Sequence, residues 1–347
     1  DPEQNGQGAR PGHNPTPKRS QLGAHYTDRD KIMMIVRPVV IEPLEAEWAV
    51  ALAKMAALID SAPKRTKERL LTPAEKRRAD KLMSEAATIH QAFIERLVHF
   101  RVLDPACGSG NFLYVALRAL KDIEHRANLD AEALGLPRGF PRVGPESVLG
   151  IELNPYAAEL ARVSVWIGEI QWMRRNGFDA AKNPVLRNLD TIECRDAVLS
   201  DDGTRAEWPI ADAVVGNPPF LGNKKMISEL GEDYVLALRK AWLEVPGGVD
   251  LVCYWFAKAW AMMVAGKLER AGLVSTNSIR GGLNREILKP IVNNGRIFEA
   301  WSDEDWTVEG AAVRVGCAGR RDCERGECKR YRLAGRSGKA VPPLGAY

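Results

Sequence analysis

The sequence predicts an α/β protein with a doubly wound, mostly parallel sheet. Short apolar strand candidates alternate with helix candidates, and the turns rich in glycine, proline and asparagine follow the strands. This order is typical of a parallel sheet with helices on both faces. Of the 347 residues, 45% are hydrophobic and 27% are charged, which excludes a chain disordered throughout, a collagen and a coiled coil.

The chain begins with a segment that we expect to be a linker or disordered. Residues 1–21 are rich in Gly, Pro, Asn and Gln and have few apolar side chains, so they cannot bury a core. Because the first residue is Asp1 and not Met, we expect the chain to be a piece of a longer one.

A helical region with a basic face is expected over residues 22–99. Residues 30–60 have a helical pattern that Pro43 is expected to interrupt. Thr72 is a suitable N-cap for the next helix, because a proline follows it at the first helical position. Residues 64–81 carry eight basic groups against three acids, which gives the region its basic face.

A second domain is expected over residues 100–317, where the pattern changes to alternating strands and helices. Residues 100–104 form the first strand candidate, and residues 112–126 the helix that follows its turn. Residues 127–146 read as a loop insertion because prolines and glycines are frequent there. Residues 148–152 form the second strand candidate.

Asn154 is an N-cap followed by a proline, and it opens a helix expected to reach residue 175. A long helix is expected around residues 250–267. Further strand candidates lie at residues 189–194, 212–216, 272–276, 296–301 and 311–317.

The first motif that carries chemistry is Asp-Pro-Ala-Cys-Gly-Ser-Gly at residues 104–110, between the first strand and its helix. Gly108 and Gly110 allow a tight turn and a close approach of the backbone to a ligand. The N-terminus of the following helix offers free N–H groups to a carboxylate or phosphate. The motif lacks the third glycine of the dinucleotide fingerprint and the Gly-Lys of a P-loop, so it predicts neither.

The second motif is Gly-Ile-Glu-Leu-Asn-Pro at residues 150–155. Glu152 ends the second strand, where a carboxylate accepts the ribose hydroxyls of a nucleoside cofactor. The distance along the chain from Asp104 exceeds the usual twenty or so residues, and we assign the excess to the insertion at 127–146.

The third motif, Asn-Pro-Pro-Phe at residues 217–220, directly follows an apolar strand. The two prolines stiffen the backbone and remove two N–H donors, which leaves carbonyls and the Asn217 amide to accept hydrogen bonds. Phe220 adds an aromatic face. Together the three motifs predict a site for a nucleoside cofactor beside a group that presents N–H donors.

In this order the motifs resemble those of the gamma-type N6-adenine DNA methyltransferases. Gly-Ala-His-Tyr-Thr at residues 23–27 resembles their N-terminal cofactor motif. The helical stretch before residue 100 is similar to that of single-polypeptide type II restriction–modification enzymes. The resemblance covers about residues 22–317 and implies a class I methyltransferase fold that uses S-adenosyl-L-methionine.

The resemblance also implies a role for each matching residue. The methionine end of the cofactor would contact Tyr26, Thr27, Asp104, Ala106, Gly108 and Gly110. Glu152 would hold the ribose, and Asp196 would receive the amine of the cofactor's adenine. The catalytic tetrad would be Asn217, Pro218, Pro219 and Phe220.

Partners and setting follow from the same resemblance. The expected partner is double-stranded DNA with a flipped adenine, together with fused or separate recognition and nuclease domains. The basic residues 318–347 would begin a recognition domain. No membrane partner is expected, because the apolar stretch at 251–266 is short and contains Lys258. Six cysteines without a disulfide or zinc pattern favour a cytoplasmic setting and no metal site.

Two other interpretations remain open. Methyltransferases that act on the glutamine side chain of release factors also use Asn-Pro-Pro-aromatic, because a carboxamide nitrogen poses the same chemical problem. The motif at 23–27 and Phe220 in place of their tyrosine argue against this class. The chain could also be a truncated fragment that binds the cofactor without catalysis.

Overall fold

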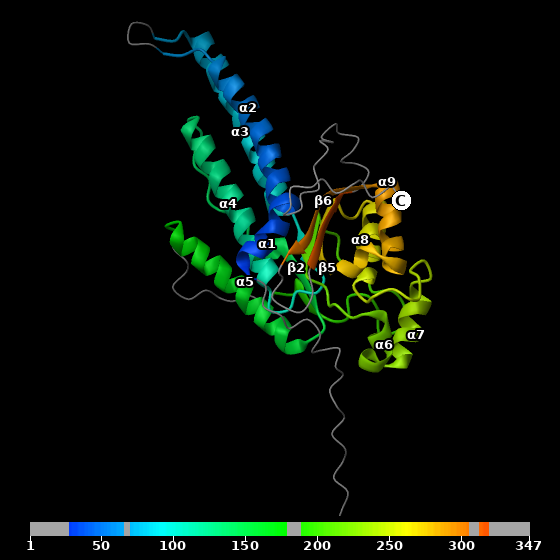
Figure 1. Ribbon diagram of the computed structural model, residues 1–347. Helices are drawn as coiled ribbons and strands as arrows, with labels where there is room; N and C mark the ends of the chain where they lie inside the picture. Colours follow the sequence, from blue (N-terminus) through cyan, green and yellow to red (C-terminus); the bar gives the residue numbers. More distant parts are fainter. Residues whose placement is uncertain (1–27, 66–69, 179–188, 305–311, 319–347) are drawn as a thin grey trace, which may run out of the picture.

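The computed structural model describes residues 28–65, 70–178, 189–304 and 312–318 (Figure 1). Its strands are β1 (Val102–Asp104), β2 (Val148–Glu152), β3 (Ile192–Cys194), β4 (Ala213–Gly216), β5 (Arg270–Thr276), β6 (Arg296–Glu304) and β7 (Ala312–Ala318). They form one sheet in the order β3-β2-β1-β4-β5-β7-β6. The strands β1 to β5 are parallel, whereas β7 runs antiparallel to both β5 and β6.

Helices precede, connect and cover these strands. The longer ones are α1 (Arg29–Val36), α2 (Glu42–Asp60), α3 (Pro73–His99), α4 (Asn111–Ala133), α5 (Pro155–Arg175), α6 (Asn223–Leu230), α7 (Glu232–Ala241), α8 (Cys253–Val264) and α9 (Leu288–Asn294). Short segments are the π-helix η2 (Arg37–Ile41) and the 3-10 turns η3 (Pro145–Ser147), η4 (Asn277–Arg280) and η5 (Gly282–Ile287). In the described part of the chain, no helix has the length and apolar character needed to cross a bilayer.

Two hydrophobic cores lie on opposite faces of the sheet. Successive strand residues point to opposite faces, so Val102 and Val215 pack with α1 to α5, while Leu103 and Val214 pack with α6 to α9. Figure 1 shows these two groups of helices on either side of the strands. The doubly wound architecture predicted from the sequence is therefore confirmed.

The expectation that Pro43 interrupts the first helix is wrong. The segments α1, η2 and α2 follow one another without a break. In a regular α-helix, a proline ring clashes with the carbonyl four residues earlier. Here that carbonyl belongs to Val39, inside the π-helical segment, where the wider turn accommodates the ring. The helix therefore continues to α2, which lies beside α3 in a long hairpin (Figure 1).

The loop expected over residues 127–146 is also shorter than predicted. Helix α4 runs on to Ala133 and is terminated by Gly135, which adopts a φ of 89°. The loop then returns onto α4, where the buried Glu124 carboxylate accepts the N–H groups of Arg142 and the next residue at 2.7 and 3.0 Å. These hydrogen bonds therefore fix the position of the insertion against α4.

The predicted strands and the helices after Asn154 and before β5 are present, with ends shifted by a few residues. Thr72 caps α3 as expected, and its backbone and hydroxyl both pair with Glu75. Helices α6 and α7 were not predicted. Residues 1–27 and 319–347, which include the proposed linker and most of the basic C-terminal segment, lie outside the described residues.

Candidate active site at the carboxyl edge of the sheet

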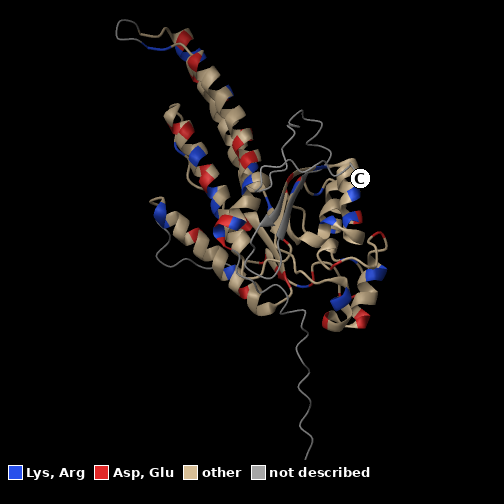
Figure 2. Cartoon of the chain, viewed as in Figure 1, with Lys and Arg blue, Asp and Glu red and all other residues tan. Residues whose placement is uncertain are grey.

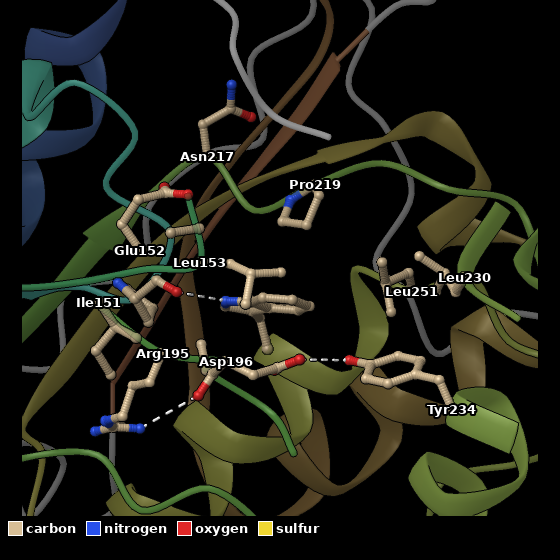
Figure 3. A pocket seen from close by; sticks show the side chains of 14 residues that line it. Ile151, Glu152, Leu153, Arg195, Asp196, Asn217, Pro219, Leu230, Tyr234 and Leu251 are labelled. Carbon is tan, nitrogen blue, oxygen red and sulfur yellow. Dashed lines mark hydrogen bonds between the residues drawn. The ribbon is translucent and has the colours of Figure 1, made fainter. Parts of the chain in front are cut away.

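The carboxyl ends of β1, β2 and β4 meet where the strand order reverses, because β1 lies between β2 and β4. Open α/β sheets bind ligands at this point. A pocket opens here. Glu152, Asp196 and Asn217 all line it (Figure 3). Pro105 and Ala106 of the first motif line it as well, so the three motifs, which are separated in the sequence, are brought together with Asp196.

Asp104 ends β1 and is buried, with only 1% of its surface exposed. Its Oδ1 accepts the N–H of Ala106 at 3.1 Å. Burial, with a smaller effect of the nearby Glu152 carboxylate, raises the pKa of Asp104 to about 8. The close packing depends on Gly216, where an added β-carbon would lie 2.5 Å from Asp104 Oδ1. The structure therefore provides a buried carboxyl that would gain from a cationic partner.

Glu152 ends β2 and is fixed by two backbone donors. Its Oε2 accepts the N–H of Gly108 at 2.8 Å, and its Oε1 accepts the N–H of Asn154 at 2.8 Å. The carboxylate thereby connects the glycine loop after β1 with the start of α5. Each oxygen keeps a second lone pair, so the carboxylate can still accept the ribose hydroxyls, as the resemblance implies.

Gly110 has a packing role that the sequence did not predict. It adopts a φ of 83° at the start of α4, and an added β-carbon would lie 2.9 Å from the Cα of Ala161 in α5. The close approach at this position is therefore between two helices. The contact of Gly110 with the methionine end of the cofactor stays a prediction.

Asp196 is held across the pocket from Asn217 (Figure 3). Its Oδ1 accepts the N–H groups of Val198 and Leu199 at 2.8 and 3.2 Å. Its Oδ2 accepts the hydroxyl of Tyr234, on α7, at 2.9 Å. The carboxylate is thus oriented on both oxygens, and its predicted contact with the cofactor's adenine stays a prediction.

Asn217 follows β4 and lies at the pocket with Pro219. Its side-chain Oδ1 is buried and has no hydrogen-bond partner among the described residues. A buried acceptor without a donor is unfavourable by about 1–3 kcal/mol, so this atom is poised for a donor that a ligand would bring. Pro218, the next residue, is buried as well.

Phe220 is half-buried and packs against both hydrophobic cores. It does not line the pocket. The structure therefore brings together part of the predicted tetrad around the pocket and leaves Phe220 just beyond it. Tyr26 and Thr27 lie outside the described residues.

Several pocket residues were missed by the sequence reasoning. Leu230 and Tyr234 come from α6 and α7, Leu251 lies just before α8, and Trp255 lies in its first turn. They belong to no short motif, and their position depends on how α6 to α8 fold back over the sheet. The apolar residues around α8 were the one feature of the sequence that pointed to this region, and they predicted only a helix of the hydrophobic core.

The strand order and the helices on both faces of the sheet match the class I methyltransferase fold. The family described as "MmeI, DNA-methyltransferase domain" matches residues 79–321, more than half of the chain. The chain therefore belongs to this family, in agreement with the resemblance of its motifs to DNA methyltransferases.

Known proteins and structures resemble the chain over most of its length. DNA methyltransferase A of Bacillus subtilis (strain 168) is 29% identical over 285 residues, which cover 78% of this chain and 28% of that protein. The ribosomal RNA large subunit methyltransferase K/L of Acinetobacter baylyi is 24% identical over 251 residues, covering 65% and 31%. The structure of the type IIL restriction-modification enzyme MmeI in complex with DNA superimposes with a TM-score of 0.63 at 21% identity, covering 93% and 40%. The chain thus spans less than half the length of each of these proteins.

Proposed function

We propose that this chain transfers a methyl group from S-adenosyl-L-methionine to the exocyclic N6 amine of an adenine flipped out of double-stranded DNA. The activity would be the modification half of a restriction–modification system in the cytoplasm. The observation that carries the proposal is the buried, unpartnered Oδ1 of Asn217 beside the pocket. An amine with two N–H groups is the complementary substrate.

The chemistry follows from the residue types. The lone pair of the adenine amine is delocalised into the ring, which makes the nitrogen a poor nucleophile. Accepting its two N–H groups on Asn217 Oδ1 and on the Pro218 carbonyl would localise that lone pair. Both prolines hold this segment rigidly, so the nitrogen would be oriented for an in-line attack, and positioning would contribute much of the rate. The proton leaves after the attack, so no strong general base is required.

The chain's own acids suit the cofactor. When bound, S-adenosyl-L-methionine supplies a methyl group activated by its sulfonium. Asp104 would bind the cofactor's ammonium, because that cation offsets the burial of the carboxyl. Glu152 would accept the ribose hydroxyls, and Asp196 the adenine amine. The methionine subsite would be completed by Tyr26, Thr27, Ala106, Gly108 and Gly110.

Double-stranded DNA would lie against the elements that follow Asn217. A base inside the duplex is out of reach of the pocket and must be flipped, and Phe220 is the nearest aromatic side chain in sequence for stacking. Basic residues lie on α6 and α7 (Figure 2). Lys224 and Lys225, on α6, are exposed and would contact phosphates. Recognition and nuclease functions would come from further domains, fused or separate.

A panel of acceptors tests the proposal. The chain is incubated with S-adenosyl-L-methionine carrying a labelled methyl group and with duplex DNA, ribosomal RNA or a glutamine-containing peptide. Transfer to DNA adenine alone is expected. Transfer to RNA or to glutamine in place of DNA would reject the proposed substrate, and cofactor binding without any transfer would favour a non-catalytic fragment.

A further inference from the structure

The segment that leads into α8, together with the first turn of that helix, contacts both loops that form the active site. The backbone N–H of Leu251 donates to the carbonyl of Leu221, the residue after the Asn-Pro-Pro-Phe motif, at 2.9 Å. Asp250 Oδ1 accepts the N–H of Asn223 at 2.9 Å. Two hydrogen bonds thus fasten residues 221–223 to residues 250–251.

Asp250 is itself fixed by the segment that follows β5. Its Oδ2 accepts the hydroxyl of Ser278 and the side-chain amide of Asn284, both at 2.7 Å. Its own N–H donates to Asn284 Oδ1 at 2.9 Å, so Asp250 and Asn284 form a two-way pair. Asn284 is buried, at 8% exposure. Such a pair, satisfied at each atom used, holds the carboxylate in one orientation.

One turn later, Trp255 reaches the other loop. Its indole Nε1 donates to the carbonyl of Pro105 at 3.1 Å, and Pro105 lies in the glycine loop directly after Asp104. Trp255 is buried, at 5% exposure, and both residues line the pocket of Figure 3. Residues 250–255 therefore hold the catalytic loop at one end and the cofactor loop at the other.

We propose that residues 250–255 form a bracket that sets the separation between the methyl donor and the accepting amine. Asp250 and Trp255 act as positioning residues through the loops they hold. This role rests on the proposed function. In-line transfer requires the two reacting atoms at a fixed distance, and a misplacement of about 1 Å can lower the rate roughly a hundredfold.

Asp250→Asn tests the catalytic end of the bracket, because it keeps the side-chain shape but turns one acceptor into a donor. That donor would face the Asn284 amide and the Ser278 hydroxyl, which also donate. The double variant Asp250→Asn with Asn284→Asp restores one donor and one acceptor across the pair. Asp201→Asn, in an exposed turn, is the matched control. Trp255→Phe tests the other end, since it keeps a ring and loses the N–H.

Three readouts are compared with wild type: amide hydrogen exchange of residues 221–223, cofactor affinity, and the single-turnover rate of methyl transfer to DNA. For Asp250→Asn we expect amide exchange at residues 221–223 to become at least tenfold faster and the single-turnover rate to fall at least tenfold. The Kd for the cofactor should stay within twofold of the wild-type value. The double variant should recover part of both. Trp255→Phe should weaken cofactor binding several-fold and also slow transfer.

The bracket proposal would be overturned if Asp250→Asn had the same amide exchange and the same transfer rate as the control Asp201→Asn. It would also be overturned if weaker cofactor binding explained the whole loss of rate in Asp250→Asn. If wild type transfers no methyl group to adenine, the proposed function fails. The bracket is then decided by exchange at residues 221–223 in Asp250→Asn and by cofactor affinity in Trp255→Phe. Unchanged values in both would overturn it.

Discussion

The buried carboxyl of Asp104 makes the stability of the chain depend on pH. Its pKa is raised to about 8 in the folded protein, whereas an exposed aspartate titrates near 3.9. Between these values the folded state holds a proton that the unfolded state has released. The contribution of the protonated Asp104 to the free energy of unfolding is therefore fully present below about pH 4, and it declines as the pH rises towards about 8.

We expect this part of the pH dependence to disappear in Asp104→Asn. Thermal unfolding measured from pH 5 to pH 9 should show a fall in Tm for the wild type that is steeper than for the variant. Parallel profiles for the two proteins would show that Asp104 is ionised in the free folded state.

Cofactor binding should release this proton if Asp104 receives the cofactor's ammonium. A cation next to the carboxyl favours its charged form, so the affinity for S-adenosyl-L-methionine should increase between pH 6 and pH 8. Titration calorimetry in two buffers with different ionisation enthalpies measures the proton release directly. Asp104→Asn should bind without releasing it; the same release from the variant would assign the proton to another group.

At the scale of elements, the contact between α4 and α5 depends on Gly110. In Gly110→Ala, the new methyl group meets the backbone of Ala161 and the residue also has an unfavourable positive φ. Gly203→Ala is the matched control, because Gly203 has a φ of 77° and nothing within 4 Å of an added β-carbon.

The control should lose about 1–2 kcal/mol of unfolding free energy from its backbone conformation alone, and Gly110→Ala should lose clearly more. Urea unfolding of both variants checks this expectation. Equal losses would mean that the helix contact adapts without penalty.

The α2–α3 hairpin is stabilised at its turn by the Thr72 capping box. Thr72→Ala removes the acceptor for the Glu75 N–H, which lies at 3.2 Å, and should lower the free energy of unfolding by about 0.5–2 kcal/mol. Thr72→Ser keeps the acceptor and should stay close to wild type. Because the cap lies at the end of α3 that is remote from β1, the cofactor affinity should be the same in the wild type and both variants. A change in cofactor affinity would show that the cap and the cofactor site are coupled.

Elements specified by local signals were the ones predicted from the sequence. Thr72 and Asn154 cap their helices, and the apolar run before Asn217 forms β4, because capping and strand burial depend on neighbouring residues. The path around Pro43 was not predictable, since a π-helical turn is a rare way to accommodate a proline.

For the whole molecule, the parallel sheet brings Asp104, Glu152, Asp196 and Asn217 to one edge although 113 positions separate the first from the last, 217 minus 104. Their gathering was predictable, because the ends of parallel strands meet at one edge. The wall formed by Tyr234 and Trp255 was not, since it depends on how helices α6 to α8 pack. The same packing places Phe220 between the two cores and leaves its stacking role to be tested.

The proposed methyl transfer depends on Asn217, which would accept a hydrogen bond from the amine of a flipped adenine in the transition state. The most direct test is a single-turnover assay that quantifies N6-methyladenine in duplex DNA, with wild type and Asn217→Ala both saturated with S-adenosyl-L-methionine. We expect N6-methyladenine with the wild type, and a rate lower by about a hundredfold or more in the variant at unchanged cofactor affinity. N6-methyladenine formed by Asn217→Ala at the wild-type rate would contradict this expectation.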